Sequence, residues 1–160
     1  MEITMDKDQL LKEWVDGAHI KSIAHHKAAA KFNRNNRILG LLTTIFTVIV
    51  STSIFASLMK TDNKIILMPA YVISFLAVIL SASNTFLKLE KLSEKHLQAG
   101  ISYGQIRKKM ELLLVNVKNV NENHLNEIIE QNSELEKNVP SIPQKIHDNA
   151  KNEVKKSSNK

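Results

Sequence analysis

Residues 38–59 read ILGLLTTIFTVIVSTSIFASLM, and residues 65–87 read IILMPAYVISFLAVILSASNTFL. Neither stretch contains a charged residue, and each exceeds the roughly 20 residues that a helix needs to cross a hydrocarbon core about 30 Å thick. Only five polar residues, Lys60 to Lys64, separate the two stretches, so the helices must be antiparallel neighbours. The pattern predicts a membrane-spanning helical hairpin.

The rest of the chain disfavours the alternative, a hairpin of core helices in a soluble bundle, because it offers too little apolar sequence to cover both faces. The chain has 160 residues, 22 Lys and Arg against 16 Asp and Glu, and no cysteine. The lack of cysteine excludes disulfides, thiolate metal sites and cysteine nucleophiles. The apolar sequence begins only at residue 38 and is too long for a signal peptide, so we expect the protein to stay whole in the membrane.

Basic residues lie at the outer ends of the hairpin. They are Lys21, Lys27, Lys31, Arg34 and Arg37 before the first span and Lys88, Lys91 and Lys95 after the second, whereas the loop has only Lys60 and Lys64. The positive-inside rule therefore predicts a multi-pass protein of the cell (inner) membrane with both termini in the cytoplasm. Because no aromatic residues alternate with these charges, we expect them to contact the lipid bilayer and not nucleic acid.

Cytoplasmic helices are predicted on both sides of the hairpin. Residues 10–37 form an N-terminal helix after a flexible start at 1–9, and residues 88–135 form one long helix. That long helix carries a heptad stripe, which consists of Leu92, His96, Ala99, Tyr103, Ile106, Met110, Leu113, Val117, Val120 and His124. Either the N-terminal helix of the same chain or the stripe of a neighbouring subunit must cover it. Residues 136–160, with Pro140 and Pro143, are predicted to be a disordered tail. The expected fold is thus an all-α membrane protein.

Catalytic motifs are absent from the sequence, so we expect neither an enzyme nor a bound cofactor. His25 and His26 are adjacent, and neighbouring side chains on a helix point about 100° apart, so the two do not form one metal site. Both are expected to be solvated or interfacial. His96 lies on the heptad stripe, where a polar residue typically sets the register of a bundle.

Hydroxyl side chains are concentrated in the first span. Thr44, Thr47 and Ser51 fall on one face with Gly40, and Ser74, Ser81 and Asn84 share a face of the second span. Small hydroxyl residues are the usual contact surface between membrane helices, but such a face also suits a water-filled pore. A single hairpin cannot enclose a channel, so a pore lined by Thr44, Thr47 and Ser51 requires a homo-oligomer. The absence of charge inside either span disfavours an ion-coupled transporter.

The order of several short motifs resembles that of the SLATT family, the SMODS- and SLOG-associating two-transmembrane effectors of bacterial conflict systems. The motifs are Trp14 in the N-terminal helix, His25 or His26 ahead of Asn33-x-x-Asn36-Arg37, and His96-x-x-Ala99-x-x-x-Tyr103-x-x-Ile106 after the second span. Ile106 stands where family members usually have Leu. Gly100, Gly104 and the polar tail have no counterpart in the pattern.

The resemblance implies a function. SLATT proteins are thought to be antiphage effectors that oligomerise and permeabilise the membrane on activation, and in many systems a separate nucleotide-sensing or signal-producing protein supplies the cue. It also implies that Trp14, His96, Ala99, Tyr103 and Ile106 are packing residues of the family motif. The alternative function is a passive membrane anchor or scaffold that recruits partners through its cytoplasmic coiled coil, but an anchor has no need of a hydroxyl face in the first span.

Overall fold

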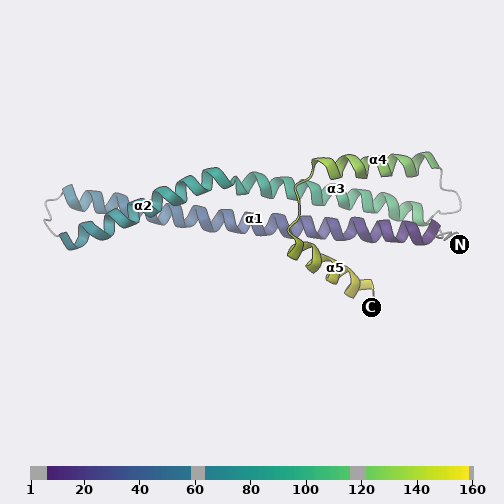
Figure 1. Ribbon diagram of the computed structural model, residues 1–160, viewed down its shortest axis with the longest axis horizontal. Coiled ribbons are helices and arrows are strands. Elements are labelled where there is room, and N and C mark those ends of the chain that lie inside the picture. The colour runs from purple at the N-terminus through teal and green to yellow at the C-terminus, as the bar shows by residue number, and fades with distance from the viewer. Residues whose placement is uncertain (1–6, 59–63, 116–121, 159–160) are drawn as a thin grey trace. The chain divides into compact units, whose positions relative to one another are not determined.

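The computed structural model describes residues 7–58, 64–115 and 122–158. Every element among them is an α-helix, which confirms the all-α class. In chain order the helices are α1 (Lys7–Leu58), α2 (Lys64–Leu87), α3 (Leu89–Val115), α4 (Glu122–Asn138) and α5 (Gln144–Ser158) (Figure 1).

Two compact units divide the chain, and α1 contributes to both. The terminal unit contains the part of α1 up to Lys31, together with α3 from Leu92 onward, α4 and α5. The apolar unit contains residues 32–91, that is, the rest of α1 and all of α2. The two ends of the sequence are therefore brought together in one unit.

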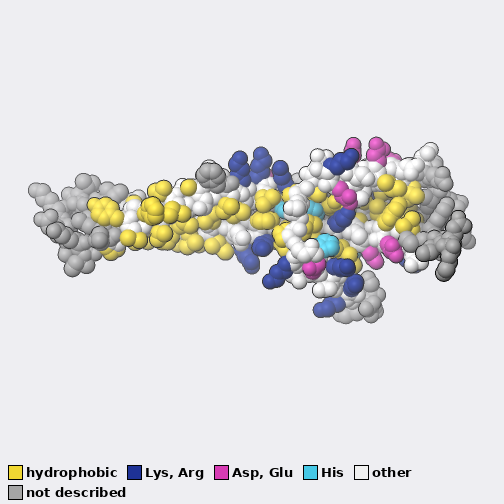
Figure 2. All heavy atoms as spheres, viewed as in Figure 1, with side chains coloured by type: hydrophobic (Ala, Val, Ile, Leu, Met, Phe, Trp, Pro, Cys, Tyr) yellow, Lys and Arg dark blue, Asp and Glu magenta, His cyan; other side chains and the backbone are white. Residues whose placement is uncertain are grey.

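Large hydrophobic side chains cover the apolar unit (Figure 2). Leu41 is 62% exposed, and Phe75 and Val78 are each 67% exposed. Among the residues that the structure describes, the stretch Tyr71–Val115 contains an 18-residue window whose mean hydropathy of 1.7 is high enough for a membrane-crossing helix. It overlaps the second predicted span, and residues 59–63 of the predicted loop lie outside the described residues.

A single residue, Lys88, separates α2 from α3. Its φ of 42° lies in the left-handed region, where an L-residue bearing a Cβ is strained. A residue in this conformation ends a helix by turning the chain away from the helical path. The helix α2 therefore ends at Leu87, and α3 starts at Leu89.

The core of the terminal unit is built on the heptad stripe of α3. The buried members of the stripe are His96, Ala99, Tyr103, Ile106 and Met110. Ile106 and Met110 cluster with Ala18 of α1 and Ile128 of α4. Of the two possible covers for the stripe, the structure thus provides the one within the same chain.

The prediction of one helix over residues 88–135 is wrong. The helix α3 ends at Val115, and Ile128 of α4 packs in the same cluster as Ile106 and Met110, so α4 folds back along α3. Asparagine is a poor helix former, and the sequence is rich in it here, at Asn116, Asn119, Asn121 and Asn123. Of the remaining members of the predicted stripe, Val117 and Val120 lie outside the described residues, and the side chain of His124 is 68% exposed on α4.

The structure also differs from the predicted disordered tail at 136–160. The helix α5 occupies most of it, and its row of Ile146, Ala150 and Val154 is buried. Pro143 precedes this helix and caps it, since its carbonyl accepts hydrogen bonds from the Ile146 and His147 amides at 2.9 and 3.2 Å. Three apolar residues on one face suffice to dock a helix that is otherwise polar. At the other end, α1 already begins at Lys7, within the predicted flexible start, and residues 1–6 lie outside the described residues.

Candidate functional site

Two buried histidines meet between α1 and α3. His25 and His96 are each only 1% exposed, and their Nδ1 atoms lie 2.9 Å apart. A neutral imidazole has one N–H donor and one acceptor nitrogen, so one ring must donate and the other accept. The pair is therefore satisfied only when a single proton lies between the two nitrogens.

An aromatic and a cationic side chain extend this histidine pair. The ring of Tyr103, which is also 1% exposed, stacks on that of His25 with centroids 5.4 Å apart and an interplanar angle of 17°. The Nζ of Lys21 lies 5.4 Å from the Tyr103 ring centroid and forms an ion pair with Glu136 of α4. The resulting His25–His96–Tyr103 cluster joins α1 to α3, and the Lys21–Glu136 ion pair beside it reaches α4.

Small residues allow α1 and α3 to approach closely enough for the histidines to meet. Ala24 and Ala28 are fully buried, and the Ser22 hydroxyl donates a 2.8 Å hydrogen bond to the Gly100 carbonyl. A Cβ at position 100 would lie 3.1 Å from the ring of His26. The glycine that had no counterpart in the family pattern thus provides room for a histidine of the opposite helix.

Burial keeps the cluster uncharged. It lowers the pKa of His25 to about 4, with smaller contributions in the same direction from His96, His26 and Lys21, and it also lowers the pKa of His96. Burial raises the pKa of Tyr103 to about 12, and the Glu136 carboxylate adds to this effect. At neutral pH the cluster is therefore a hydrogen-bonded packing element and has no group ready to exchange a proton. Within the described ranges no three His, Asp or Glu side chains are placed to hold a metal ion.

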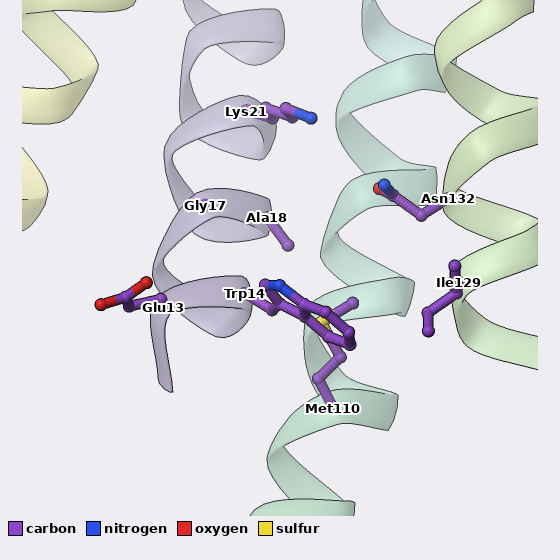
Figure 3. A pocket seen from close by; sticks show the side chains of 8 residues that line it. All are labelled: Glu13, Trp14, Gly17, Ala18, Lys21, Met110, Ile129 and Asn132. Atoms are coloured by element: carbon purple, nitrogen blue, oxygen red, sulfur yellow. The ribbon is translucent and has the colours of Figure 1, made fainter. Parts of the chain in front are cut away.

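A cleft of about 300 Å³ lies beside this cluster, between α1, α3 and α4 (Figure 3). Its lining residues are Glu13, Trp14, Gly17, Ala18, Lys21, Met110, Ile129 and Asn132. The Lys21 ammonium and the Asn132 amide at its rim both bind Glu136. Two of the polar side chains that line the cleft are thus already engaged within the chain, and Trp14, Ala18, Met110 and Ile129 give it an apolar lining.

The packing residues of the family motif all lie in the terminal unit. His96, Ala99, Tyr103 and Ile106 all lie on the buried face of α3, and half-buried Trp14 packs against the core at the cleft. What the sequence did not reveal is the pairing of His25 with His96, which are 71 residues apart. The only available signal was the position of His25 among small residues of α1.

The predicted pore residues lie on the α1 part of the apolar unit. Thr44, Thr47 and Ser51 are all exposed, and each hydroxyl donates to the carbonyl four residues earlier, at 2.9, 2.8 and 2.9 Å. This bonding satisfies the O–H donors within the helix. The oxygen atoms of all three therefore form an exposed polar row in a single chain.

A family model described as SMODS and SLOG-associating 2TM effector domain family 4 matches residues 11–156. The chain belongs to this family. The match confirms the resemblance and extends it through α5, so the C-terminal helix is part of the SLATT domain. The domain is a two-transmembrane effector domain associated with SMODS and SLOG conflict systems. No curated protein and no solved structure matches the chain.

Proposed function

We propose that this SLATT protein is a membrane effector of a bacterial antiphage system, which oligomerises and permeabilises the membrane when activated. The observation that carries the proposal is the family match, since it covers the apolar unit and nearly all of the terminal unit. The proposed role requires no catalysis by the chain. The expected result of activation is a loss of the membrane potential.

The proposed membrane part is the two-span hairpin of residues 38–59 and 65–87, in the cell (inner) membrane with both termini in the cytoplasm. Three observations support it: the two uncharged stretches, the basic residues at their outer ends, and the exposed hydrophobic side chains of the apolar unit. The two-transmembrane description of the family agrees with this arrangement.

The proposed conducting path is lined by Thr44, Thr47 and Ser51, with Gly40 at its cytoplasmic entrance. Because their O–H donors are bound within α1, the hydroxyl oxygens keep acceptor lone pairs that can replace part of an ion's hydration shell. Arg34 and Arg37 would surround the cytoplasmic mouth and favour anions. We therefore propose a weakly selective path.

Activation is proposed to come from another protein. The family is named for its association with SMODS and SLOG, and the terminal unit supplies a folded surface on which a separate nucleotide-sensing or signal-producing partner can act. No cofactor is required in this proposal.

The test is controlled expression of the full chain in bacteria containing a membrane-potential dye. The wild type should depolarise the cells, and the Thr47→Leu/Ser51→Leu variant should not, because two leucines narrow and dry the path while leaving the span hydrophobic enough to insert. Membrane protein level and cross-linked oligomer should remain unchanged.

The matched control is Thr52→Leu, which makes the same chemical change on another face of α1, where the hydroxyl also binds the carbonyl four residues earlier. This control should depolarise cells like the wild type. If the Thr47→Leu/Ser51→Leu variant depolarises cells as fast as the wild type, the row of Thr44, Thr47 and Ser51 is a packing surface. A wild type that never depolarises cells would favour the alternative, a membrane anchor that recruits partners.

A further inference from the structure

The two C-terminal helices carry opposite charge. The charged residues of α4 are Glu122, Glu127, Glu130, Glu134, Glu136 and Lys137, and those of α5 are Lys145, Asp148, Lys151, Glu153, Lys155 and Lys156. In Figure 2 magenta acidic side chains lie along the α4 edge of the terminal unit beside a dark blue basic one, and several dark blue side chains lie along α5 with a magenta one among them. The terminal unit thus has an acidic helix and a basic helix.

Ion pairs fix these two helices to different sides of α1. Lys21 of α1 pairs with Glu136 of α4, and Lys27 of α1 pairs with Glu153 of α5. Six helical residues correspond to a rise of about 9 Å and a rotation of about 120° between the two positions. The acidic and the basic helix therefore lie at neighbouring levels of α1 but face different directions.

Each helix also presents a pair of like charges without an ion-pair partner among the residues that the structure describes. Glu130 and Glu134 on α4, and Lys151 and Lys155 on α5, are all exposed, and the structure describes no ion pair for any of the four. Like charges four residues apart on a helix repel each other. Such pairs become favourable when a surface of opposite charge covers them.

We propose that the acidic row Glu130–Glu134 of one copy binds the basic row Lys151–Lys155 of the next copy. The contact is heterologous, since different surfaces of the two copies meet, and contacts of this kind close into rings when the rotation between copies permits. The proposal rests on the proposed function, which requires several copies side by side in one membrane and in the same orientation.

Charge complementarity selects a second copy as the occupant. An anionic lipid surface would attract the lysines of α5 but repel the glutamates of α4, so it accounts for one row and not the other. A second copy presents both rows at once, each opposite its complement.

The experiment compares chemical cross-linking of the full chain in membranes for two charge reversals, Glu130→Lys/Glu134→Lys and Lys151→Glu/Lys155→Glu. Each should weaken association by about tenfold, because two attractions become two repulsions. Joining all four substitutions in one chain restores complementarity and should restore the oligomer. Co-expression of the two reversed chains should also restore it, because every contact in an alternating assembly is then between opposite charges.

Asp8→Lys/Asp16→Lys is the matched control, since it makes the same change at exposed positions of α1 and should leave cross-linking unchanged. Two results overturn the proposal: reversed chains that cross-link like the wild type, or a fourfold variant that stays monomeric. If Lys151→Glu/Lys155→Glu only lowers binding to vesicles containing phosphatidylglycerol, the lysines belong to a lipid surface and the proposal falls.

Depolarisation, measured in parallel, separates this proposal from the proposed function. If the charge reversals leave both the oligomer and the depolarisation intact, the proposed interface is wrong and the proposed pore stands. If the oligomer is lost on each charge reversal and restored by the combined substitutions, but no protein depolarises the cells, the proposed interface stands and the proposed pore is wrong.

Discussion

At the scale of single residues, the His25–His96 pair is the most demanding contact of the terminal unit. A buried polar group without a partner destabilises a protein, so each histidine depends on the other. Only one register of α1 against α3 brings the two Nδ1 atoms together. The pair therefore favours a single alignment of the helices, which the surrounding small residues alone would not specify.

Acid should destabilise the terminal unit in a defined pH range. The pKa values of His25 and His96 lie below the unfolded value of about 6.5, so the unfolded chain binds protons first as the pH falls. Stability is complete above pH 6.5 and should decrease from pH 6.5 towards 4, by up to about 1.4 kcal/mol per pH unit for each of the two histidines. Thermal unfolding of the detergent-solubilised chain between pH 7.5 and 4.5 measures this. The hydrogen bond with Lys21 lowers the pKa of Glu136, so the stabilisation that this carboxylate provides is lost only at lower pH.

His96→Asn is the comparison, because its amide can still bond to His25 while the titrating group is removed. The free energy of unfolding of this variant should vary less between pH 6.5 and 4.5 than that of the wild type. His19, whose pKa burial also lowers, is present in both proteins and cancels. An unchanged pH slope would mean that the pair is not the source of the acid sensitivity.

At the scale of helices, the glycines of α3 differ in what surrounds them. A Cβ at Gly104 would meet the Ser22 hydroxyl at 3.5 Å, an ordinary contact, whereas a Cβ at Gly100 would be crowded by the His26 ring at 3.1 Å. Gly104→Ala should therefore stabilise the protein by about 0.5–1 kcal/mol through the better helix propensity of alanine, and Gly100→Ala should gain less.

Thermal unfolding measures this difference, and Gly17→Ala supplies the reference, since nothing lies within 4 Å of a Cβ placed there. Gly17→Ala and Gly104→Ala should both raise the melting temperature. A Gly100→Ala variant that gains as much as these two would mean that the His26 ring moves aside at no cost.

Helical periodicity was sufficient to predict some elements and not others. The stripe of α3 from His96 to Met110 could be predicted because its apolar residues recur regularly, and the structure buries it. The helix α5 was missed because its row of Ile146, Ala150 and Val154 is short and its composition is polar. The reversal between α3 and α4 depends on the docking of Ile128 against Met110, a tertiary contact that no local pattern encodes. The pairing of His25 with His96 is non-local for the same reason.

At the scale of the whole molecule, we predict that both ends of the chain lie on the same side of the membrane. Reporter fusions at Met1 and Lys160 should both give a cytoplasmic signal, and a reporter inserted after Asp62 should give an external one, because basic residues are concentrated outside the hairpin. An external signal at Lys160 would mean that one of the two stretches does not cross.

The ion pair between Lys27 and Glu153 joins residues 126 positions apart, with the whole apolar unit between them. At about 5–20 residues per second, a ribosome takes roughly 6–25 s to make that interval. Both apolar stretches are made before α3, α4 and α5, so the part of α1 up to Lys31 is completed well before its partners in the terminal unit. The terminal unit can therefore close around α1 only after both apolar stretches have been synthesised, and this part of α1 waits through that interval without the helices that bury it.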